Sequence, residues 1–256
     1  MNSPFLSIIT PTHNRVLDGK LQRCLNSVRC QVFPDFEHII VDDGGNQNVA
    51  ELVNEVTWDW SLGLPDGRFK VIRIEHGGRV IARNAGMAAA QGQWITWLDD
   101  DDALDPMYTA TYKYYADLEP DVRLWVGGVV VHGMVKDASG QHICPKWTRL
   151  RQAWMPSVNT DGNHEIFPSG HVGTGMFVFH RSCLEKTGLM PPWLNHNQIA
   201  DGIDEFLGVP PGTTGYSSAK RLVGNPFGDD HAMFQKLCLF YQVHTIEACL
   251  YVQFVR

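Results

Sequence analysis

The segment Gln93–Asp102 reads QWITWLDDDD. Its first half, Trp94–Leu98, is aromatic, β-branched and apolar, which is the composition of a short strand buried on both faces. Four consecutive aspartates, Asp99–Asp102, follow directly, and like charges at this spacing repel one another. Open α/β sheets bind ligands at the carboxyl ends of their strands, so a ligand site is expected here. Hard carboxylate oxygens suit Mg²⁺ or Mn²⁺; a solvated acidic loop is the alternative.

The composition is that of a folded globular protein. The 256 residues are 44% apolar and 19% charged, which is enough for one large α/β domain or two fused halves. The net charge is -7 and no Lys/Arg block occurs, which argues against nucleic acid as a partner. The 6 cysteines are scattered without a CxxC pair, which favours reduced thiols in a cytosol over a disulfide framework or a zinc site.

The sequence also gives expectations about location. The N-terminus lacks a basic region and leads straight into a strand, so no signal peptide is expected. The most apolar long window, Leu124–Val135, is interrupted by two glycines and a histidine and is too short to span a bilayer. We therefore expect a cytoplasmic protein without a transmembrane segment. Peripheral contact with the inner face of the membrane is left open, as is the oligomeric state.

Strand and helix patterns alternate along the first half. Strands are expected at 5–10, 36–41, 69–74 and 94–98, and helices at 17–31, 49–56 and 79–91. This rhythm predicts crossover units and a mainly parallel sheet. Three of the strands end in polar loops, reading PTHNR at 11–15, DDGG at 42–45 and DDDD at 99–102. Because the strand ends lie along one edge of such a sheet, the loops are expected to converge.

The pattern changes after Asp105-Pro106, which predicts a helix start with aspartate as cap and proline in the first turn. Helices are expected near 108–115 and 181–186 and from 228 onward, and strands at 123–132, 172–179 and 245–255. The segments 137–170 and 190–225 are expected to be loops, the second long enough to be functional. We predict one continuous domain with halves at 1–105 and 106–256.

Four segments together resemble a known family. They read SIITPTHNR at 7–15, IIVDDGG at 39–45, ARNAGMAAAQGQWITWLDDDD at 82–102 and GDDHAMFQKL at 228–237. In this order and at this spacing they resemble the family 2 glycosyltransferases. The resemblance implies the GT-A fold, an α/β fold whose mainly parallel central sheet is flanked by helices, with a smaller mixed C-terminal acceptor region. It also implies an enzyme that moves a sugar from a nucleotide-diphosphate sugar, expected to be a UDP-sugar, to an acceptor hydroxyl.

The resemblance assigns the nucleotide-sugar donor to residues 1–105. Asp43 would read the nucleotide base, with Pro11 and His13 as walls of the same pocket; a plain Asx turn is the alternative for the DDGG segment. The helix that precedes the central strand matches the family's segment near the ribose and diphosphate, through Arg79, Arg83 and Asn84. The forked donors of arginine suit phosphate, although a surface salt bridge is a nearly equal alternative for Arg79.

The same resemblance implies a metal site. Asp99 and Asp101 match the family's Asp-x-Asp motif, and Asp101 is the expected direct ligand of Mn²⁺ or Mg²⁺. Asp99 and Asp100 would lie nearer the ribose or metal-bound water, and Asp99 is also a candidate metal ligand. The family often carries a histidine after its last strand, but this sequence stops at Arg256. His244 is a candidate substitute, and a packed core histidine is the alternative.

Asp230 resembles the catalytic base, and helix capping is its alternative role. If the preceding Asp229 caps the helix, Asp230 is available for chemistry; the Asp-Asp pair departs mildly from the Glu-Asp of many relatives. One base and one displacement imply inversion at the anomeric carbon. The Gln-x-x-Arg-Trp segment of processive synthases does not occur in this sequence, which favours transfer of a single sugar.

The acceptor, a glycan or another hydroxyl compound, is expected in residues 106–256. Indole faces stack on sugar rings, and three tryptophans fall in segments expected to be loops, although ordinary packing is at least as good an explanation: Trp147, Trp154 and Trp193. Small residues let a substrate approach the backbone, so Gly173 and Gly175 are expected to line the acceptor cleft. Asp229, beside the base, joins the acceptor residues, and the 190–225 loop is a candidate lid.

Two other functions stay open from the sequence. A sugar-phosphate nucleotidyltransferase has a similar sheet, but PTHNR is not the glycine-rich loop with arginine that such enzymes carry after the first strand. A non-catalytic nucleotide-sugar or glycan-binding module would bind donor without turnover. A Rossmann dehydrogenase is disfavoured because no GxGxxG follows the first strand.

Overall fold

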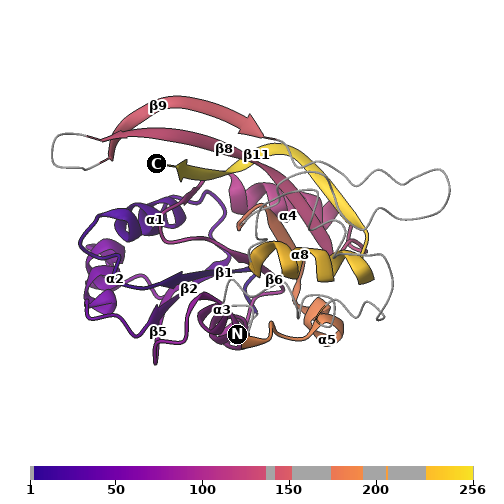
Figure 1. The fold of residues 1–256 in the computed structure, drawn as a ribbon, viewed down its shortest axis with the longest axis horizontal. Coiled ribbons are helices and arrows are strands. Elements are labelled where there is room, and N and C mark those ends of the chain that lie inside the picture. Colours follow the sequence, from indigo (N-terminus) through magenta and orange to yellow (C-terminus); the bar gives the residue numbers. More distant parts are fainter. Residues whose placement is uncertain (1–2, 137–141, 152–173, 193–205, 207–228, 256) are drawn as a thin grey trace.

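The computed structural model describes residues 3–136, 142–151, 174–192, 206 and 229–255 (Figure 1). The first half contributes the strands β1 (Leu6–Thr12), β2 (Phe36–Asp43), β5 (Phe69–Ile74) and β6 (Trp94–Trp97). β1 pairs in parallel with β2 and with β6, and β5 pairs in parallel with β2. These parallel strands confirm the prediction from the strand and helix rhythm.

Helices α1 (Lys20–Arg29), α2 (Val49–Thr57) and α3 (Arg79–Ala89) connect these strands. α3 packs on β1 and β2, while α1 and α2 pack against each other. Every residue of β1 and β2 is buried, as expected for strands that are covered on both faces. A small separate sheet, β3 (Trp58–Asp59) with β4 (Leu64–Pro65), lies between α2 and β5 in the chain.

The second half completes the same sheet with antiparallel and parallel pairs. β10 (Phe177–His180) runs antiparallel between β6 and β8 (Leu124–Lys136), and β11 (Val243–Val255) runs parallel to β8. β9 (His142–Arg151) pairs with β8, and β7 (Ala103–Leu104) pairs with β11. The remaining elements are α4 (Tyr108–Leu118), the 3-10 turn η1 (Arg181–Cys183), α5 (Leu184–Thr187) and α8 (Asp229–Phe240).

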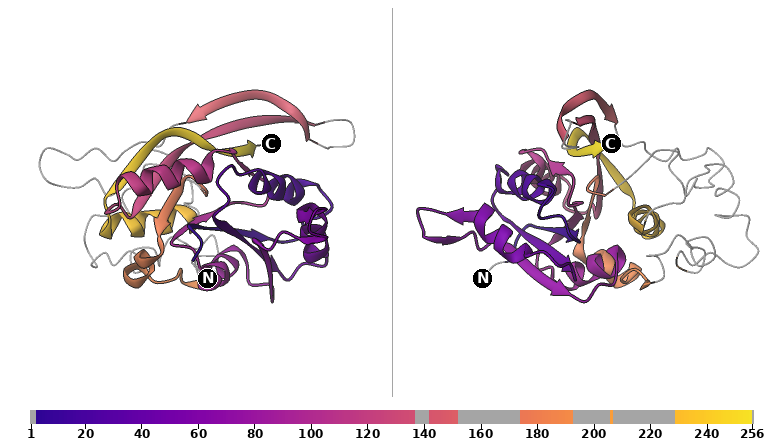
Figure 2. Two further views of the ribbon diagram at one scale, coloured as in Figure 1. Left: turned by 180° about the vertical axis from the view of Figure 1, so that it is seen from behind. Right: turned by 60° about the vertical axis from the view of Figure 1, so that its left-hand side comes forward.

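Apart from β3 and β4, the described strands form one nine-stranded sheet in the order β5-β2-β1-β6-β10-β8-β11-β7, with β9 beside β8. The long strands β8, β9 and β11 arch over the parallel part, and the view from behind shows the same arrangement (Figure 2). Residues of both halves therefore lie in one sheet. Within the described part of the chain, no helix is long and apolar enough to cross a membrane.

Three local predictions were wrong. The segment expected to be a loop from 137 contains β9, because β8 runs on to Lys136 and offers an edge for pairing; Trp147 thus lies in a strand. The helix expected at Asp105-Pro106 begins at Tyr108, because the Asp105 carboxylate accepts the Met107 N–H at 2.9 Å in a turn. β10 begins at Phe177 rather than at 172, since the chain turns at 174–176.

Candidate functional site

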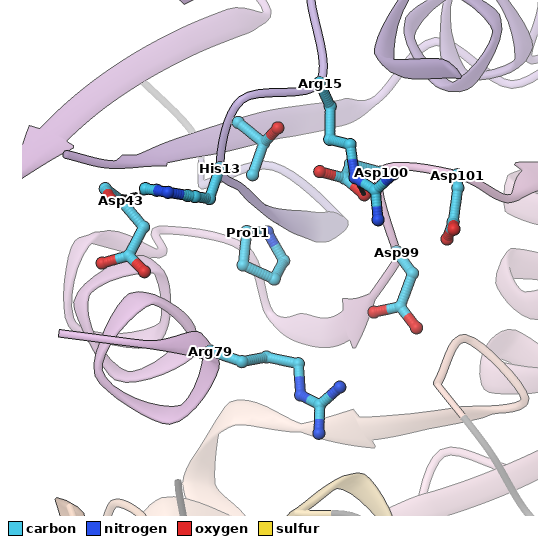
Figure 3. Close-up of a pocket in the computed structure, with 9 residues that line it drawn as sticks. Pro11, His13, Arg15, Asp43, Arg79, Asp99, Asp100 and Asp101 are labelled. Carbon is cyan, nitrogen blue, oxygen red and sulfur yellow. Dashed lines mark hydrogen bonds and ion pairs between the residues drawn. The ribbon is translucent and has the colours of Figure 1, made fainter. Parts of the chain in front are cut away.

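The carboxyl ends of β1, β2 and β6 and the start of α3 enclose a cleft of about 290 Å³ (Figure 3). All three polar loops predicted to converge contribute to it. Its lining contains seven predicted site residues together with two that were not predicted: Pro11, His13, Asp43, Arg79, Asp99, Asp100 and Asp101, with Thr12 and Arg15. The aspartates of the β6 loop lie at one end and Asp43 at the other. A ligand in this cleft would span both acidic loops.

At its own end of the cleft, Asp43 holds the loop before α3. Its carboxylate accepts the N–H groups of Gly77 at 2.8 Å and Gly78 at 3.0 Å, and His76 Nδ1 lies 2.9 Å away. His13 Nδ1 is 2.8 Å from the Asp43 carbonyl oxygen, and the His13 and His76 rings lie 4.3 Å apart between centroids. These contacts hold together the carboxyl ends of β1, β2 and β5 at this end of the cleft. Nothing in the sequence pattern singled out His76.

The Asx-turn alternative applies to Asp42 and not to its neighbour. The Asp42 carboxylate accepts the Gly45 N–H at 3.2 Å and pairs with Arg73 Nη1 at 2.5 Å. One of the two aspartates thus closes the turn, and the other faces the cleft.

The four consecutive aspartates have different surroundings. Asp102 is buried and accepts hydrogen bonds from the Tyr251 hydroxyl and from the Phe254 N–H, the latter at 3.0 Å. Burial, together with the nearby Asp99, raises the pKa of Asp102 to about 8 against the opposing effect of the Tyr251 hydrogen bond. Its two hydrogen bonds fix β11 to this loop, and Asp102 is turned away from the cleft.

Asp100 has a different environment and lines the cleft. Burial raises the pKa of Asp100 to about 7, with Asp101 adding to the effect and Arg15 opposing it.

Asp101 differs from the other three. Among the described residues, no hydrogen bond or ion pair engages its carboxylate, and its side chain faces the cleft (Figure 3). Asp99 also faces the cleft, with its side chain 31% exposed and its Oδ1 2.8 Å from Arg83 Nη2. Its pKa is raised by burial, opposed by Arg83, and raised further by Asp230 and Asp101. A hard divalent cation fits this donor set, because it would relieve carboxylate repulsion that the arginines balance only in part.

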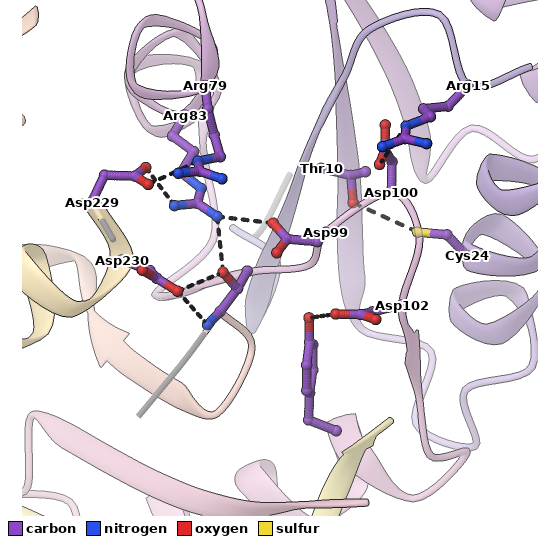
Figure 4. Close-up of polar contacts among 12 residues, drawn as sticks. Thr10, Arg15, Cys24, Arg79, Arg83, Asp99, Asp100, Asp102, Asp229 and Asp230 are labelled. Atoms are coloured by element: carbon purple, nitrogen blue, oxygen red, sulfur yellow. Dashed lines mark hydrogen bonds and ion pairs between the residues drawn. The ribbon is translucent and has the colours of Figure 1, made fainter. Parts of the chain in front are cut away.

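Arg83 lies behind the cleft and is 1% exposed. Its Nη1 is 2.5 Å from Asp229 Oδ2, and its Nη2 is 2.8 Å from Asp99 Oδ1 and 2.9 Å from Thr174 Oγ1 (Figure 4). The guanidinium also lies over the Trp97 ring, at 4.7 Å from its centroid. Burial alone would lower the pKa of Arg83, but the carboxylates of Asp229 and Asp99 raise it by more. The guanidinium therefore stays protonated. All of these contacts are with protein groups.

Arg79 shares Asp229 with Arg83. Its Nε is 2.8 Å from Asp229 Oδ1, but the side chain is 59% exposed and lines the cleft. The salt-bridge alternative for Arg79 is thus observed alongside a position where the guanidinium can also meet a ligand. Asp229 is buried, and its carboxylate pairs with these two arginines.

Asp230 lies in a smaller pocket next to the cleft. The pocket has a volume of about 50 Å³, and its lining includes Asp99, Thr174 and Tyr251. Asp230 Oδ2 accepts hydrogen bonds from the backbone N–H and the hydroxyl of Thr174, both at 2.9 Å. Because Asp99 lines both this pocket and the cleft, the two cavities meet at one carboxylate.

The other predicted residues have these positions. The Asn84 side chain exchanges two hydrogen bonds with the backbone of Met190, at 2.6 and 3.1 Å, and thereby holds that segment. Gly175 has φ +72°, and a Cβ there would lie 2.1 Å from the Tyr251 ring, so packing alone requires glycine.

His244 lies 3.1 Å from Glu119 in a different pocket and not in the cleft. Trp154, Trp193 and Gly173, with most of the expected 190–225 loop, lie outside the described residues.

Thr174 was not predicted. Residues 171–175 read HVGTG, and only the two glycines of this segment were predicted to line the acceptor cleft. In the structure, Thr174 between them makes hydrogen bonds with Asp230 and Arg83. A small polar residue between two glycines was the only hint in the sequence that Thr174 belongs to the site. Its partners could not be predicted, because they lie 56 and 91 residues away in the chain.

Comparison with known proteins relates the chain to one family. Residues 7–188 match the model of glycosyl transferase family 2. An uncharacterized glycosyltransferase of Nostoc sp., alr2836, is 30% identical over 190 residues, which cover 73% of this chain and 54% of that protein. Other curated bacterial glycosyltransferases match over 46–48% of this chain, and the match spans only 16–38% of their own length.

Two solved structures have the same fold. S. aureus TarS 1-349 in complex with UDP aligns with a TM-score of 0.57 at 17% identity, covering 98% of this chain and 60% of TarS 1-349. The mannosyltransferase PcManGT from Pyrobaculum calidifontis, in complex with GDP-Man and Mn²⁺, aligns with a TM-score of 0.57 at 15% identity, covering 99% of this chain and 57% of that one. The GT-A fold expected from the sequence is confirmed. The chain belongs to glycosyl transferase family 2.

Proposed function

We propose that the chain is a glycosyltransferase that moves a single sugar from a UDP-sugar to an acceptor hydroxyl with inversion at the anomeric carbon. The proposal depends on one observation: the cleft that contains Asp101 and Arg79 meets the Asp230 pocket at Asp99. A donor in the cleft and an acceptor at the pocket would bring their reacting atoms together at this carboxylate. TarS binds UDP and PcManGT binds GDP-Man at the same TM-score, so the choice of uridine rests on the resemblance seen in the sequence.

The donor would lie along the cleft, bound by residues of the first half, 1–105. Its base would meet Asp43, Pro11 and His13, and its diphosphate would lie near Arg79, whose guanidinium is exposed to the cleft. Arg83 is 1% exposed and is not among the residues that line the cleft, so we assign it to holding the site rather than to direct contact with phosphate.

Asp101 and Asp99 would hold Mn²⁺ or Mg²⁺, with Asp100 beside them. The Mn²⁺ in the PcManGT complex supports a divalent cation in this fold. When bound, such a cation neutralises the charge that develops on a leaving diphosphate.

Asp230 would act as the general base. It takes the proton of the acceptor hydroxyl while that oxygen forms a bond to the anomeric carbon, and the bond from that carbon to the UDP oxygen breaks. The products are the glycoside, UDP and the protonated Asp230, which later releases its proton. General-base assistance is worth about 10²- to 10⁴-fold in rate. A single displacement of this kind inverts the anomeric configuration.

The acceptor would bind in the second half, 106–256, at the mouth of the Asp230 pocket. Of the proposed acceptor residues, Gly175 stands in the chain between Thr174 and Met176, which both line this pocket, and Asp229 directly precedes Asp230. Trp154 and Gly173 keep their proposed role on the strength of the sequence alone.

The test is a thermal-shift panel of UDP-, GDP-, dTDP- and CMP-sugars, with and without Mn²⁺, followed by transfer assays and NMR of the product anomer. We expect a UDP-sugar to raise the melting temperature most, because a ligand of the folded state stabilises it in proportion to its affinity. Consumption of a nucleoside triphosphate with release of pyrophosphate would instead support a nucleotidyltransferase. Donor binding without hydrolysis or transfer would support a binding module.

A further inference from the structure

We infer that Thr174 is a positioning residue that orients the carboxylate of Asp230 and connects it, through Arg83, to the donor aspartate Asp99. The inference rests on the proposed role of Asp230 as the base.

The direction of the hydrogen bonds follows from the chemistry of the three groups. A guanidinium can only donate, so the Thr174 hydroxyl must accept the proton of Arg83 Nη2, 2.9 Å away. The hydroxyl proton then points to Asp230 Oδ2, also at 2.9 Å. The Thr174 N–H donates to the same oxygen at 2.9 Å. With two donors on one oxygen, rotation of the carboxylate about its Cβ–Cγ bond is restricted.

The surroundings hold this arrangement rigidly. Thr174 is 4% exposed and Arg83 is 1% exposed, so neither can leave its partners without uncovering a buried polar group. The next residue, Gly175, has φ +72° and packs so closely on Tyr251 that the turn carrying Thr174 has little freedom. The backbone thereby aims the Thr174 N–H at Asp230.

Arg83 makes the connection to the donor side. One nitrogen, Nη2, contacts both Asp99 and Thr174, while Nη1 contacts Asp229 (Figure 4). A donor or cation that engages Asp99 therefore acts on the same guanidinium that fixes the Thr174 hydroxyl. This gives a physical route by which occupation of the donor cleft can set the orientation of the base.

The test compares Thr174→Val, which has the same shape without the hydroxyl, with Thr174→Ser, which keeps it. T174V removes both hydrogen bonds of the hydroxyl, the one donated to Asp230 and the one accepted from Arg83. Loss of the hydrogen bond to the Asp230 carboxylate predicts that kcat falls by about 10- to 100-fold, while KM for the nucleotide sugar stays within about 3-fold. The acidic limb of the pH profile of kcat/KM should move to higher pH, because a donor that favours the ionised carboxylate is gone. T174S should recover most of kcat and the original pH profile.

The matched control is Thr57→Val in α2. The Thr57 hydroxyl is equally buried and donates to the Val53 carbonyl at 2.7 Å, away from the cleft. T57V should keep kcat and the pH profile even if it lowers the melting temperature. If T174V does not fold, Thr174→Ala removes the hydroxyl without leaving a branched side chain beside Arg83, and the same kinetic changes are expected.

A folded T174V enzyme with unchanged kcat and pH profile would overturn the inference, as would a variant whose only defect is a weaker donor affinity. Asp230→Asn separates this outcome from failure of the proposed function. If D230N keeps kcat close to that of the unmodified enzyme, the assignment of the base is wrong whatever Thr174 does. If D230N is inactive and T174V is normal, only the positioning role is wrong.

Discussion

The guanidinium of Arg83 and the carboxylate of Asp229 form an ion pair of 2.5 Å, although 146 residues separate them in the chain. Each side chain is 1% exposed. The pair joins α3, which follows the third parallel strand, to the start of α8, which carries Asp230. It thus connects the proposed donor cleft to the proposed catalytic base.

Replacing one partner of this pair should destabilise the protein strongly. Asp229→Ala leaves the Arg83 cation buried without its main counterion, and breaking a buried pair costs about 3–5 kcal/mol. Urea denaturation should show this loss in the free energy of unfolding. The matched control is Lys113→Ala, since Lys113 pairs with Asp117 on the surface of α4 and such pairs contribute about 0–1 kcal/mol. Similar losses for both variants would contradict the importance that we give to the buried pair.

Asp230→Asn should lower kcat for sugar transfer by about 10²- to 10⁴-fold, because the amide cannot take the acceptor's proton. Nucleotide binding should be nearly intact, since Asp230 lies outside the lining of the donor cleft. Isothermal titration calorimetry with UDP checks this. A large loss of UDP affinity would mean that the residue is structural.

Asp101→Ala should remove the effect of Mn²⁺ on donor binding. No described residue engages the Asp101 carboxylate, so its removal should change stability little while removing the expected metal ligand. The measurement is UDP affinity with and without Mn²⁺, and Asp121→Ala, an exposed aspartate outside the cleft, serves as control. Full activity of the variant in excess chelator would rule out the metal role.

His38 should make the protein sensitive to acid. Burial lowers the pKa of His38 from 6.5 to about 3, and its Nε2 lies 2.8 Å from the Thr10 hydroxyl. Because the folded pKa is depressed, the unfolded chain binds the extra proton between pH 6.5 and about 3. The associated stability is present above pH 6.5 and falls as the pH drops, by up to about 1.4 kcal/mol per pH unit.

Melting temperatures measured from pH 7 down to about 4.5 check this window, which lies inside the range set by the two pKa values. His38→Gln keeps a polar group near Thr10 but cannot bind the proton, so its melting curve should depend less on pH. Equal acid sensitivity in both proteins would place the responsible group elsewhere.

The sequence by itself determined the parallel part of the sheet and the position of the cleft. Strands such as β1 and β6 are apolar runs that end in polar loops, and parallel pairing brings those ends to one edge whatever the details of packing. Pro11, Asp43 and the aspartates at 99–101 therefore came together as expected. β9 was missed, because an edge strand forms by pairing with β8 and carries little signal of its own.

Only the tertiary structure decided what each charged residue does. The four aspartates look alike in the sequence, yet β11 buries Asp102 under Tyr251 while Asp101 stays accessible to the cleft. Tertiary contacts likewise bury Arg83 behind the cleft, and they place the Thr174 hydroxyl within hydrogen-bond distance of Asp230. These roles depend on partners 56 to 149 residues away, and local composition and periodicity hold no information about contacts at that separation.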